Sequence, residues 1–222
     1  MRQKPVADVL LLTWASGVLD ALSYLRAKVF TANMTGNTVV LGLAIAGPDR
    51  SRVPDATLAI GAFAAGVLLS AIVLLRLRRT DPENELKAGT SLEIPFAVGF
   101  AILWDAFPGD GPAWAVPAML GAAACALGIQ SVAARRLRLK GVATTFITGT
   151  ITTAIVSAIE RYDPSAHTSS EAKSSPLMLG GMFVLYIVAA MTGGALALAE
   201  RPVAPYLALA ALVTVWIRSF RR

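Results

Sequence analysis

The chain has 222 residues, of which 55% are hydrophobic and only 15% are charged. This balance is more apolar than that of soluble globular domains, and it predicts an all-α integral membrane protein. One cysteine and one histidine, Cys125 and His167, exclude an internal disulfide and are too few for a structural zinc site. We therefore expect no metal and no other cofactor. In so apolar a chain the net charge of +6 bears on membrane orientation rather than on nucleic-acid binding.

Six segments are apolar enough, or nearly so, to form membrane-crossing helices, which need roughly 20 such residues. In chain order they span residues 6–24, 56–75, 88–104, 113–134, 176–199 and 202–217. Asp20 interrupts the first segment, and Glu93 lies near the start of the third. The basic start and apolar run of the first segment also resemble a secretory signal. We assign the segment to the mature fold, because the motif that follows it has a partner later in the chain.

Two further uncharged stretches, residues 29–47 and 141–159, are long enough to cross but are rich in Thr, Asn and Gly. If both cross, the N-terminal side of the membrane holds 9 of the 20 basic residues; if both dip in and return, it holds 15. Lys and Arg favour the cytoplasmic side of a membrane. The sequence therefore predicts six crossing helices, two short re-entrant half-helices and cytoplasmic termini. Eight crossing helices in parallel repeats are the alternative.

The two Thr-rich stretches are also similar to each other. Residues 29–37 (VFTANMTGN) and 142–150 (VATTFITGT) match at Val, at two Thr and at Gly with a constant offset. In the helix before each stretch lies a glycine, Gly17 in one case and Gly128 in the other. We predict a single transmembrane domain made of two repeats, residues 1–107 and 113–222. Three crossings per repeat is an odd number, so the second repeat would be inverted relative to the first, as in many transporters.

Each Thr-Gly motif is typical of the start of a half-helix, because Thr and Asn cap helices and Gly allows a sharp turn. Half-helices that enter from opposite faces would point their N-termini at one another near the midplane. There they favour anionic or strongly hydrogen-bonding solutes. The alternative is that these polar side chains only cap helices and join neighbouring crossings. The candidate solute-binding residues are Asp20, Thr31, Asn33, Thr35, Gly36, Asn37, Gln130, Thr144, Thr145, Thr148, Gly149 and Thr150.

Asp20 is the most distinctive of these candidates, because an ionisable side chain within an apolar span is rare and usually functional. It could act as a proton relay, a counter-charge for a solute or a gate. Alternatively, it pairs with Arg26 or Lys28 near the membrane surface. Gln130 occupies the comparable region of the second repeat, where it either binds solute or joins two helices by hydrogen bonds.

These motifs resemble those of the YoaK-like family of bacterial integral membrane proteins, a domain of unknown function. The matching strings are Gly17-x-x-Asp20, residues 30–38 (FTANMTGNT), Gly128-x-Gln130 and residues 144–150 (TTFITGT). The resemblance covers nearly the whole chain and implies about six helices in the bacterial inner (cytoplasmic) membrane. It implies no substrate, and it departs at Ser131, where we expect Asn.

From these patterns we expect a small-solute transporter or permease whose site lies at the midplane between the two Thr-Gly motifs. A passive channel for small polar or anionic solutes is one alternative, and a non-transporting scaffold or lipid-interacting protein is another. We do not expect an enzyme, because the sequence shows no pair of intramembrane carboxylates, no metal-ligand cluster and no nucleophile with a nearby base. The expected partners are the lipid bilayer and an unknown small solute. Assembly into a homo-oligomer is compatible with the sequence.

Overall fold

The computed structural model describes residues 3–76, 82–109, 111–136, 155 and 176–220. Seven helices make up almost all of this part of the chain, and it contains no strand, so the all-α prediction is confirmed. The helices are α1 (Gln3–Ala27), α2 (Met34–Ala46), α3 (Val53–Arg76), α4 (Pro82–Ala106), α5 (Ala115–Arg136), α7 (Pro176–Leu198) and α8 (Ala204–Phe220). Five of them, α1, α3, α4, α5 and α7, are long and apolar enough to cross a membrane, while α2 and α8 are shorter.

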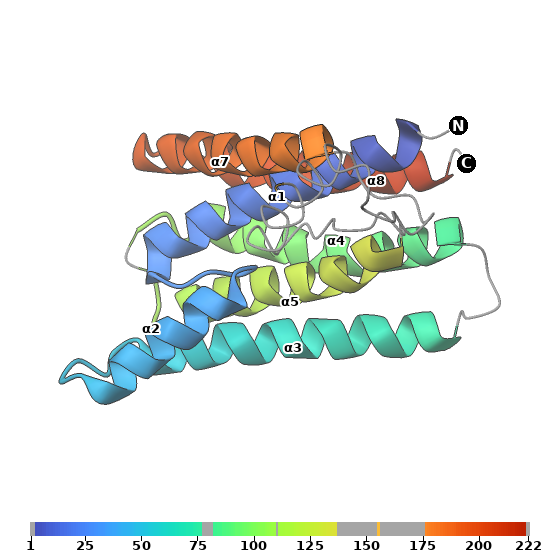
Figure 1. The fold of residues 1–222 in the computed structure, drawn as a ribbon. Coiled ribbons are helices and arrows are strands. Elements are labelled where there is room, and N and C mark those ends of the chain that lie inside the picture. Colours follow the sequence, from blue (N-terminus) through green and yellow to red (C-terminus); the bar gives the residue numbers. More distant parts are fainter. Residues whose placement is uncertain (1–2, 77–81, 110, 137–154, 156–175, 221–222) are drawn as a thin grey trace.

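The helices other than α2 run along one bundle in alternating directions (Figure 1). As a result both chain termini lie at one end of the bundle, which we call the terminal end. The connection from α1 through α2 to α3 lies at the opposite end, which we call the α2 end. Each of the six predicted crossing segments overlaps one of these helices, although α8 has only 17 residues.

The first Thr-rich stretch forms a short helix rather than a long one. α2 has 13 residues, and it follows a non-helical segment, residues 28–33. The side chain of Asn33 caps α2 by accepting a hydrogen bond from the backbone N–H of Gly36 at 3.1 Å. The end of α1 and the start of α3 lie together at the α2 end of the bundle (Figure 1). The second Thr-rich stretch, residues 141–159, lies outside the described residues except for Ile155.

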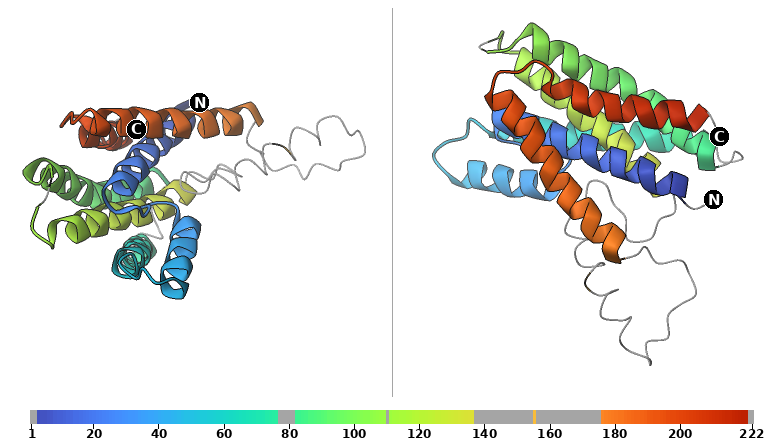
Figure 2. Two further views of the ribbon diagram at one scale, coloured as in Figure 1. Left: turned by 90° about the vertical axis from the view of Figure 1, so that its left-hand side faces the viewer. Right: turned by 90° about the horizontal axis from the view of Figure 1, so that it is seen from above.

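The centre of the bundle forms around α1 and α5. In the most apolar 18-residue stretch of each helix, 67% of the residues are buried in α1 and 61% in α5, compared with 22% in α3 and 17% in α7. A view along the bundle shows α7 and α8 on one side, α2 and α3 on the other, and α1, α4 and α5 between them (Figure 2). The main buried cluster joins Leu19 of α1, Phe100 of α4, Leu127 of α5 and Leu212 of α8. The exposed apolar faces of α3 and α7 are suited to contact with lipid.

Two helix crossings in this bundle are built alike. Gly17 of α1 faces α7 so closely that an added Cβ would lie 2.7 Å from the carbonyl oxygen of Tyr186 and 3.4 Å from the backbone nitrogen four residues later. Gly128 of α5 faces α3 in the same way. There an added Cβ would lie 2.2 Å from the carbonyl oxygen of Phe63 and 3.0 Å from the backbone nitrogen four residues later. In both crossings the missing side chain lets two helix backbones approach closely.

A second set of contacts repeats this likeness. One buried cluster contains Val9 of α1 with Leu179 and Met182 of α7, and another contains Leu120 of α5 with Ala56 and Ala59 of α3. Val9 of α1 and Leu120 of α5 are the same number of residues apart in the sequence as Gly17 and Gly128. Likewise, Ala56 and Ala59 of α3 precede Leu179 and Met182 of α7, respectively, by the same number of residues as Phe63 precedes Tyr186. Thus α1 packs on α7 as α5 packs on α3, and the two pairs run in opposite directions along the bundle (Figure 1).

Candidate functional site

The candidate site is centred on Asp20, which lies on α1 about two turns before the end of the helix. Its side chain is buried, with 3% of the residue exposed. One carboxylate oxygen, Oδ1, accepts hydrogen bonds from the backbone N–H groups of Thr31 at 2.7 Å and Ala32 at 2.6 Å, and from the Thr31 hydroxyl at 3.2 Å. The other, Oδ2, accepts a hydrogen bond from the hydroxyl of Tyr186 on α7. This set of four donors matches what a carboxylate, an acceptor-only group when ionised, can receive.

Gly17 explains how Tyr186 reaches this carboxylate. Residues 17 and 20 lie one turn apart on the same face of α1. Because Gly17 has no side chain, the backbone of α7 comes close enough for the tyrosine hydroxyl to meet Asp20. The Gly-x-x-Asp spacing therefore provides both the close helix contact and the acceptor that uses it.

The non-helical segment before α2 is held in place largely by its own side chains. Asn37 pairs with both backbone groups of Phe30: its amide nitrogen donates to the Phe30 carbonyl at 2.6 Å, and its amide oxygen accepts from the Phe30 N–H at 2.8 Å. The Phe30 ring stacks on Tyr24 at 5.0 Å between centroids. A Cβ at Gly36 would lie only 3.1 Å from the Phe30 ring. The motif thus folds into a compact unit that Asp20 attaches to α1.

The structure divides the predicted solute-binding residues of the first motif into two groups. Thr31 and Asn37 are fully buried and serve the hydrogen bonds of the segment itself. Asn33 and Thr35 are exposed at the start of α2. The second motif, with Thr144, Thr145, Thr148, Gly149 and Thr150, lies outside the described residues.

Gln130 joins two helices through its side-chain amide. From α5 its amide nitrogen donates to the Ser16 hydroxyl at 2.8 Å and to the Leu12 carbonyl at 3.2 Å, both on α1. Ser131, which stands where the family resemblance leads us to expect Asn, donates to the carbonyl of Gly128 on its own helix at 2.9 Å. The helix-joining interpretation of Gln130 therefore describes its observed contacts.

In the structure Asp20 receives hydrogen bonds from hydroxyl and backbone N–H groups. The alternative prediction, in which it pairs with Arg26 or Lys28, does not describe these contacts. Arg26 lies over the ring of Trp104 at 4.4 Å and donates to the Gly109 carbonyl at 3.4 Å. Lys28 lies over the ring of Tyr24 at 5.3 Å. Both cations are thus engaged at the α2 end of the bundle.

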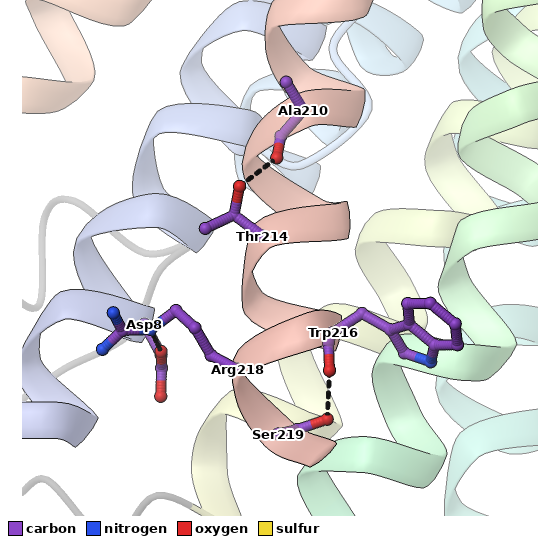
Figure 3. Close-up of polar contacts among 6 residues, drawn as sticks. All are labelled: Asp8, Ala210, Thr214, Trp216, Arg218 and Ser219. Atoms are coloured by element: carbon purple, nitrogen blue, oxygen red, sulfur yellow. Dashed lines mark hydrogen bonds and ion pairs between the residues drawn. The ribbon is translucent and has the colours of Figure 1, made fainter. Parts of the chain in front are cut away.

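A partly buried ion pair joins the two terminal helices at the other end. The guanidinium of Arg218 on α8 contacts the carboxylate of Asp8 on α1 at 2.8 Å, and the Asp8 side chain is fully buried. Figure 3 shows Trp216 on the opposite side of α8. From there its indole N–H donates to the Ser91 hydroxyl of α4 at 2.8 Å. These contacts attach α8 to α1 and to α4.

Sequence reasoning missed two residues of interest. Tyr186 lies within a predicted crossing segment, and no spacing in the sequence distinguishes it from an ordinary lipid-facing aromatic. Glu93 on α4 carried a usable signal, because it is an ionisable residue in an apolar span, as Asp20 is. It is fully buried, and neither of its carboxylate oxygens has a hydrogen-bond partner in the part of the chain that the structure describes. Within the described residues no group of three or more His, Cys, Asp or Glu is arranged to hold a metal ion.

Comparison with known proteins agrees with the membrane assignment. Residues 9–218 match a family described as a protein of unknown function (DUF1275). The UPF0700 transmembrane protein YoaK of Bacillus subtilis (strain 168) is 32% identical over 144 residues, which are 64% of this chain and 61% of that relative. The match therefore spans less than two thirds of the relative's length. No solved structure matches the chain. Since the family match extends over nearly all of the helices, this chain belongs to DUF1275, the family of YoaK-like membrane proteins.

Proposed function

We propose that this protein carries a small solute across the membrane by alternating movement of two inverted repeats, residues 1–107 and 113–222. In this proposal each repeat contributes three crossing helices and one re-entrant half-helix, and α2 is the half-helix of the first repeat. Inverted repeats of this kind are common in secondary transporters, where one part rocks against the other around a site near the midplane.

The observation that carries the proposal is the likeness of the two glycine crossings. Gly17 meets α7 through the same pair of backbone atoms, a carbonyl and the N–H four residues later, through which Gly128 meets α3. The helix pairs also run in opposite directions along the bundle (Figure 1), as an axis in the membrane plane requires. Packing that repeats with inverted direction supports two equivalent halves rather than a single irregular bundle.

Charge and helix direction together support cytoplasmic termini in the bacterial inner membrane. α3 ends, α4 begins and α5 ends at the terminal end of the bundle (Figure 1), and near these helix ends the chain carries Arg76, Lys87, Arg135 and Arg136. Arg78 and Arg79 follow α3 in the sequence. The α2 end holds Arg26, Lys28, Arg50, Arg52 and Arg201. Adding the remaining basic residues near the two termini increases the excess at the terminal end, which is the side that the positive-inside rule assigns to the cytoplasm.

Cysteine labelling tests this topology. In a Cys125→Ser background, single cysteines at Arg26, Arg50, Arg138 and Arg161 are treated with a membrane-impermeant thiol reagent from outside intact cells. We expect labelling at positions 26 and 50 and protection at 138 and 161 until the cells are opened. Labelling of position 138 from outside would instead favour eight crossings.

We propose that the solute site lies at the start of α2, with the second Thr-Gly motif as its expected counterpart from the other repeat. Asn33 and Thr35 are exposed there, and the N-terminus of a helix favours anions and strong hydrogen-bond acceptors. Asp20 connects the segment before this helix to Tyr186 of α7. A shift of α7 against α1 would therefore disturb the segment that presents Asn33 and Thr35, which links helix movement to solute binding.

A second candidate function is a non-transporting membrane scaffold, and one observation favours it. The amides of Asn33 and Asn37 are both used inside the motif, one as a helix cap and one paired with Phe30. A motif that satisfies its own polar groups has a structural reason to contain them without binding any solute.

A swelling assay separates these functions. Liposomes containing the purified protein are exposed to osmotic gradients of formate, nitrate, urea and glycerol, and light scattering reports solute entry. We expect faster entry of at least one solute than in empty liposomes, and slower entry with Thr35→Val. Thr38→Val is the matched control, since among the described residues the Thr38 hydroxyl bonds only to the Met34 carbonyl of the same helix. No entry above empty liposomes would favour the scaffold.

Exchange kinetics then distinguish a carrier from a passive channel. For a carrier, unlabelled solute on the far side of the membrane accelerates the movement of labelled solute, because the loaded carrier reorients faster than the empty one. A channel shows no such acceleration. Entry without acceleration would therefore favour the channel alternative.

A further inference from the structure

Glu93 is a carboxyl group without a hydrogen-bond partner near the middle of the bundle. It lies on α4, close to the centre of the apolar stretch Asn84–Ala106. None of its surface is exposed, and neither oxygen has a hydrogen-bond partner within the described part of the chain. An ionised carboxylate in such surroundings is costly, because it loses its hydration and gains no donor in return. The surroundings of Glu93 therefore favour its neutral, protonated form.

No charged side chain described on the neighbouring helices offsets this cost. α4 packs against α5 and α8 and makes a smaller contact with α3. The ionisable side chains described on those helices are Asp55 and Arg76 of α3, Cys125 and Arg135 of α5, and Tyr206 and Arg218 of α8. None of them bonds to Glu93: Arg218 is paired with Asp8, and Tyr206 donates to Asp105. On α4 itself, Glu85, Lys87 and Asp105 lie at least one full turn away along the helix.

The backbone beside Glu93 is also the weakest point of α4. Pro95 lies two residues later inside the helix and has no N–H to donate to the carbonyl of Ser91. Helices bend preferentially at such positions. A bend of α4 here would open the surroundings of Glu93 and admit water to the carboxyl group.

We propose that Glu93 is a membrane-embedded proton-binding site, protonated in the present conformation and deprotonated when α4 moves and water reaches it. The step is a simple acid–base exchange, in which a carboxylate oxygen takes a proton from water on one side and returns it to water on the other. The proton-binding site stands on the burial and isolation of Glu93 alone. Its use to drive a solute across the membrane rests on the proposed carrier function.

Carbodiimide labelling tests the proton-binding site directly. Dicyclohexylcarbodiimide partitions into apolar sites and adds to a carboxyl group that carries its proton, leaving a stable adduct that mass spectrometry locates. We expect the adduct on Glu93 of the folded protein at neutral pH, and its loss as the pH is raised. Asp20, which has four hydrogen-bond donors, should remain unlabelled. Absence of the adduct from Glu93 at neutral pH, with other apolar probes entering normally, would overturn the proposal.

Infrared spectroscopy provides a second measurement that does not need transport. Glu93→Gln keeps the size of the side chain and removes the acid. The difference between wild-type and variant spectra at neutral pH should contain the carbonyl stretch of one protonated carboxyl group. A carboxylate band in its place would overturn the proposal. If the variant does not fold, carbodiimide labelling of the wild-type protein shows by itself whether Glu93 carries a proton.

Flux measurements test the coupling separately. In liposomes that transport a solute, an imposed pH gradient should drive its accumulation in the wild type at least about tenfold more than in Glu93→Gln, with exchange retained in the variant. Labelling of Glu93 with gradient-independent flux would overturn the coupling and leave the proton site standing. Labelling without any flux would overturn the carrier function alone.

Discussion

Asp20 and Glu93 are both carboxyl groups buried in apolar helices, yet their surroundings are opposite. Asp20 accepts four hydrogen bonds from the segment before α2 and from Tyr186. Glu93 accepts none. Both carboxyl groups are buried in the protein, so the number of hydrogen-bond donors around each one distinguishes them. Asp20 is built to hold two parts of the fold together, whereas Glu93 is free to change its protonation.

The largest expected difference in stability is between variants that lack one or the other of these carboxyl groups. Asp20→Ala leaves two buried backbone N–H groups and two hydroxyls without an acceptor, and we expect it to destabilise the protein by about 3 kcal/mol. Glu93→Leu removes no hydrogen bond and replaces a costly polar group, so we expect no loss, or a gain of about 1–2 kcal/mol. Thermal unfolding in detergent measures both. Equal destabilisation by the two substitutions would contradict the comparison.

We expect a smaller loss of stability when a side chain is added at Gly17, where the close approach of α7 to α1 lets Tyr186 reach Asp20. In Gly17→Ala the new Cβ would lie 2.7 Å from the Tyr186 carbonyl oxygen, so α7 must move away. We expect a loss of about 2 kcal/mol from this overpacking. Gly121→Ala on α5 is the matched control, because nothing lies within 4 Å of its added Cβ. The control should be neutral or gain up to about 1 kcal/mol in helix propensity.

The tyrosine hydroxyl by itself should count for less. Tyr186→Phe removes one of the four donors to Asp20 and leaves the helix contact intact, and hydrogen bonds between membrane helices contribute about 1 kcal/mol. We expect the melting temperature to fall slightly in the wild-type background and not at all in an Asp20→Ala background. An undiminished effect in the second background would show that Tyr186 acts through other contacts.

Much of the fold could be predicted from the sequence because membrane burial leaves a strong pattern. Long uncharged runs locate the helices, and all six predicted crossing segments overlap helices of the structure. The boundaries were less accurate where polar residues continue a helix beyond its apolar part, as in α4, which begins at Pro82 rather than near residue 88. Helix hydrogen bonding extends past the membrane surface, whereas hydropathy follows only the apolar part.

The partners of each site residue could not be predicted in the same way. The sequence identified Asp20 as unusual, but its real donors include two backbone N–H groups and a tyrosine on a helix far along the chain. Neither backbone donors nor distant helix neighbours leave a sequence pattern. Glu93 could have been selected by the rule that selected Asp20, yet only the packing of α4 shows that it has no partner.

The smallest expected effect concerns the backbone at the point where the Asp20-bound segment begins. Lys28 follows the end of α1 with φ of 57°, a left-handed conformation that favours glycine. Lys28→Gly should therefore stabilise the protein by about 1 kcal/mol. Lys28→Ala separates this effect from the loss of the lysine contact with the Tyr24 ring, since alanine removes the ammonium group and keeps the Cβ.

The same substitution shows whether Asp20 sets that conformation. If the hydrogen bonds of Thr31 and Ala32 to Asp20 hold the segment in place, the gain from Lys28→Gly should shrink when Asp20 is replaced by alanine, because the chain can then relax around residue 28. In a Glu93→Leu background the gain should stay unchanged, since Glu93 bonds to no part of the segment. A thermodynamic cycle of four proteins, with and without Lys28→Gly in the wild-type background and in one substituted background, gives each coupling. An equal gain in the Asp20→Ala and Glu93→Leu backgrounds would mean that the left-handed turn belongs to α1 alone.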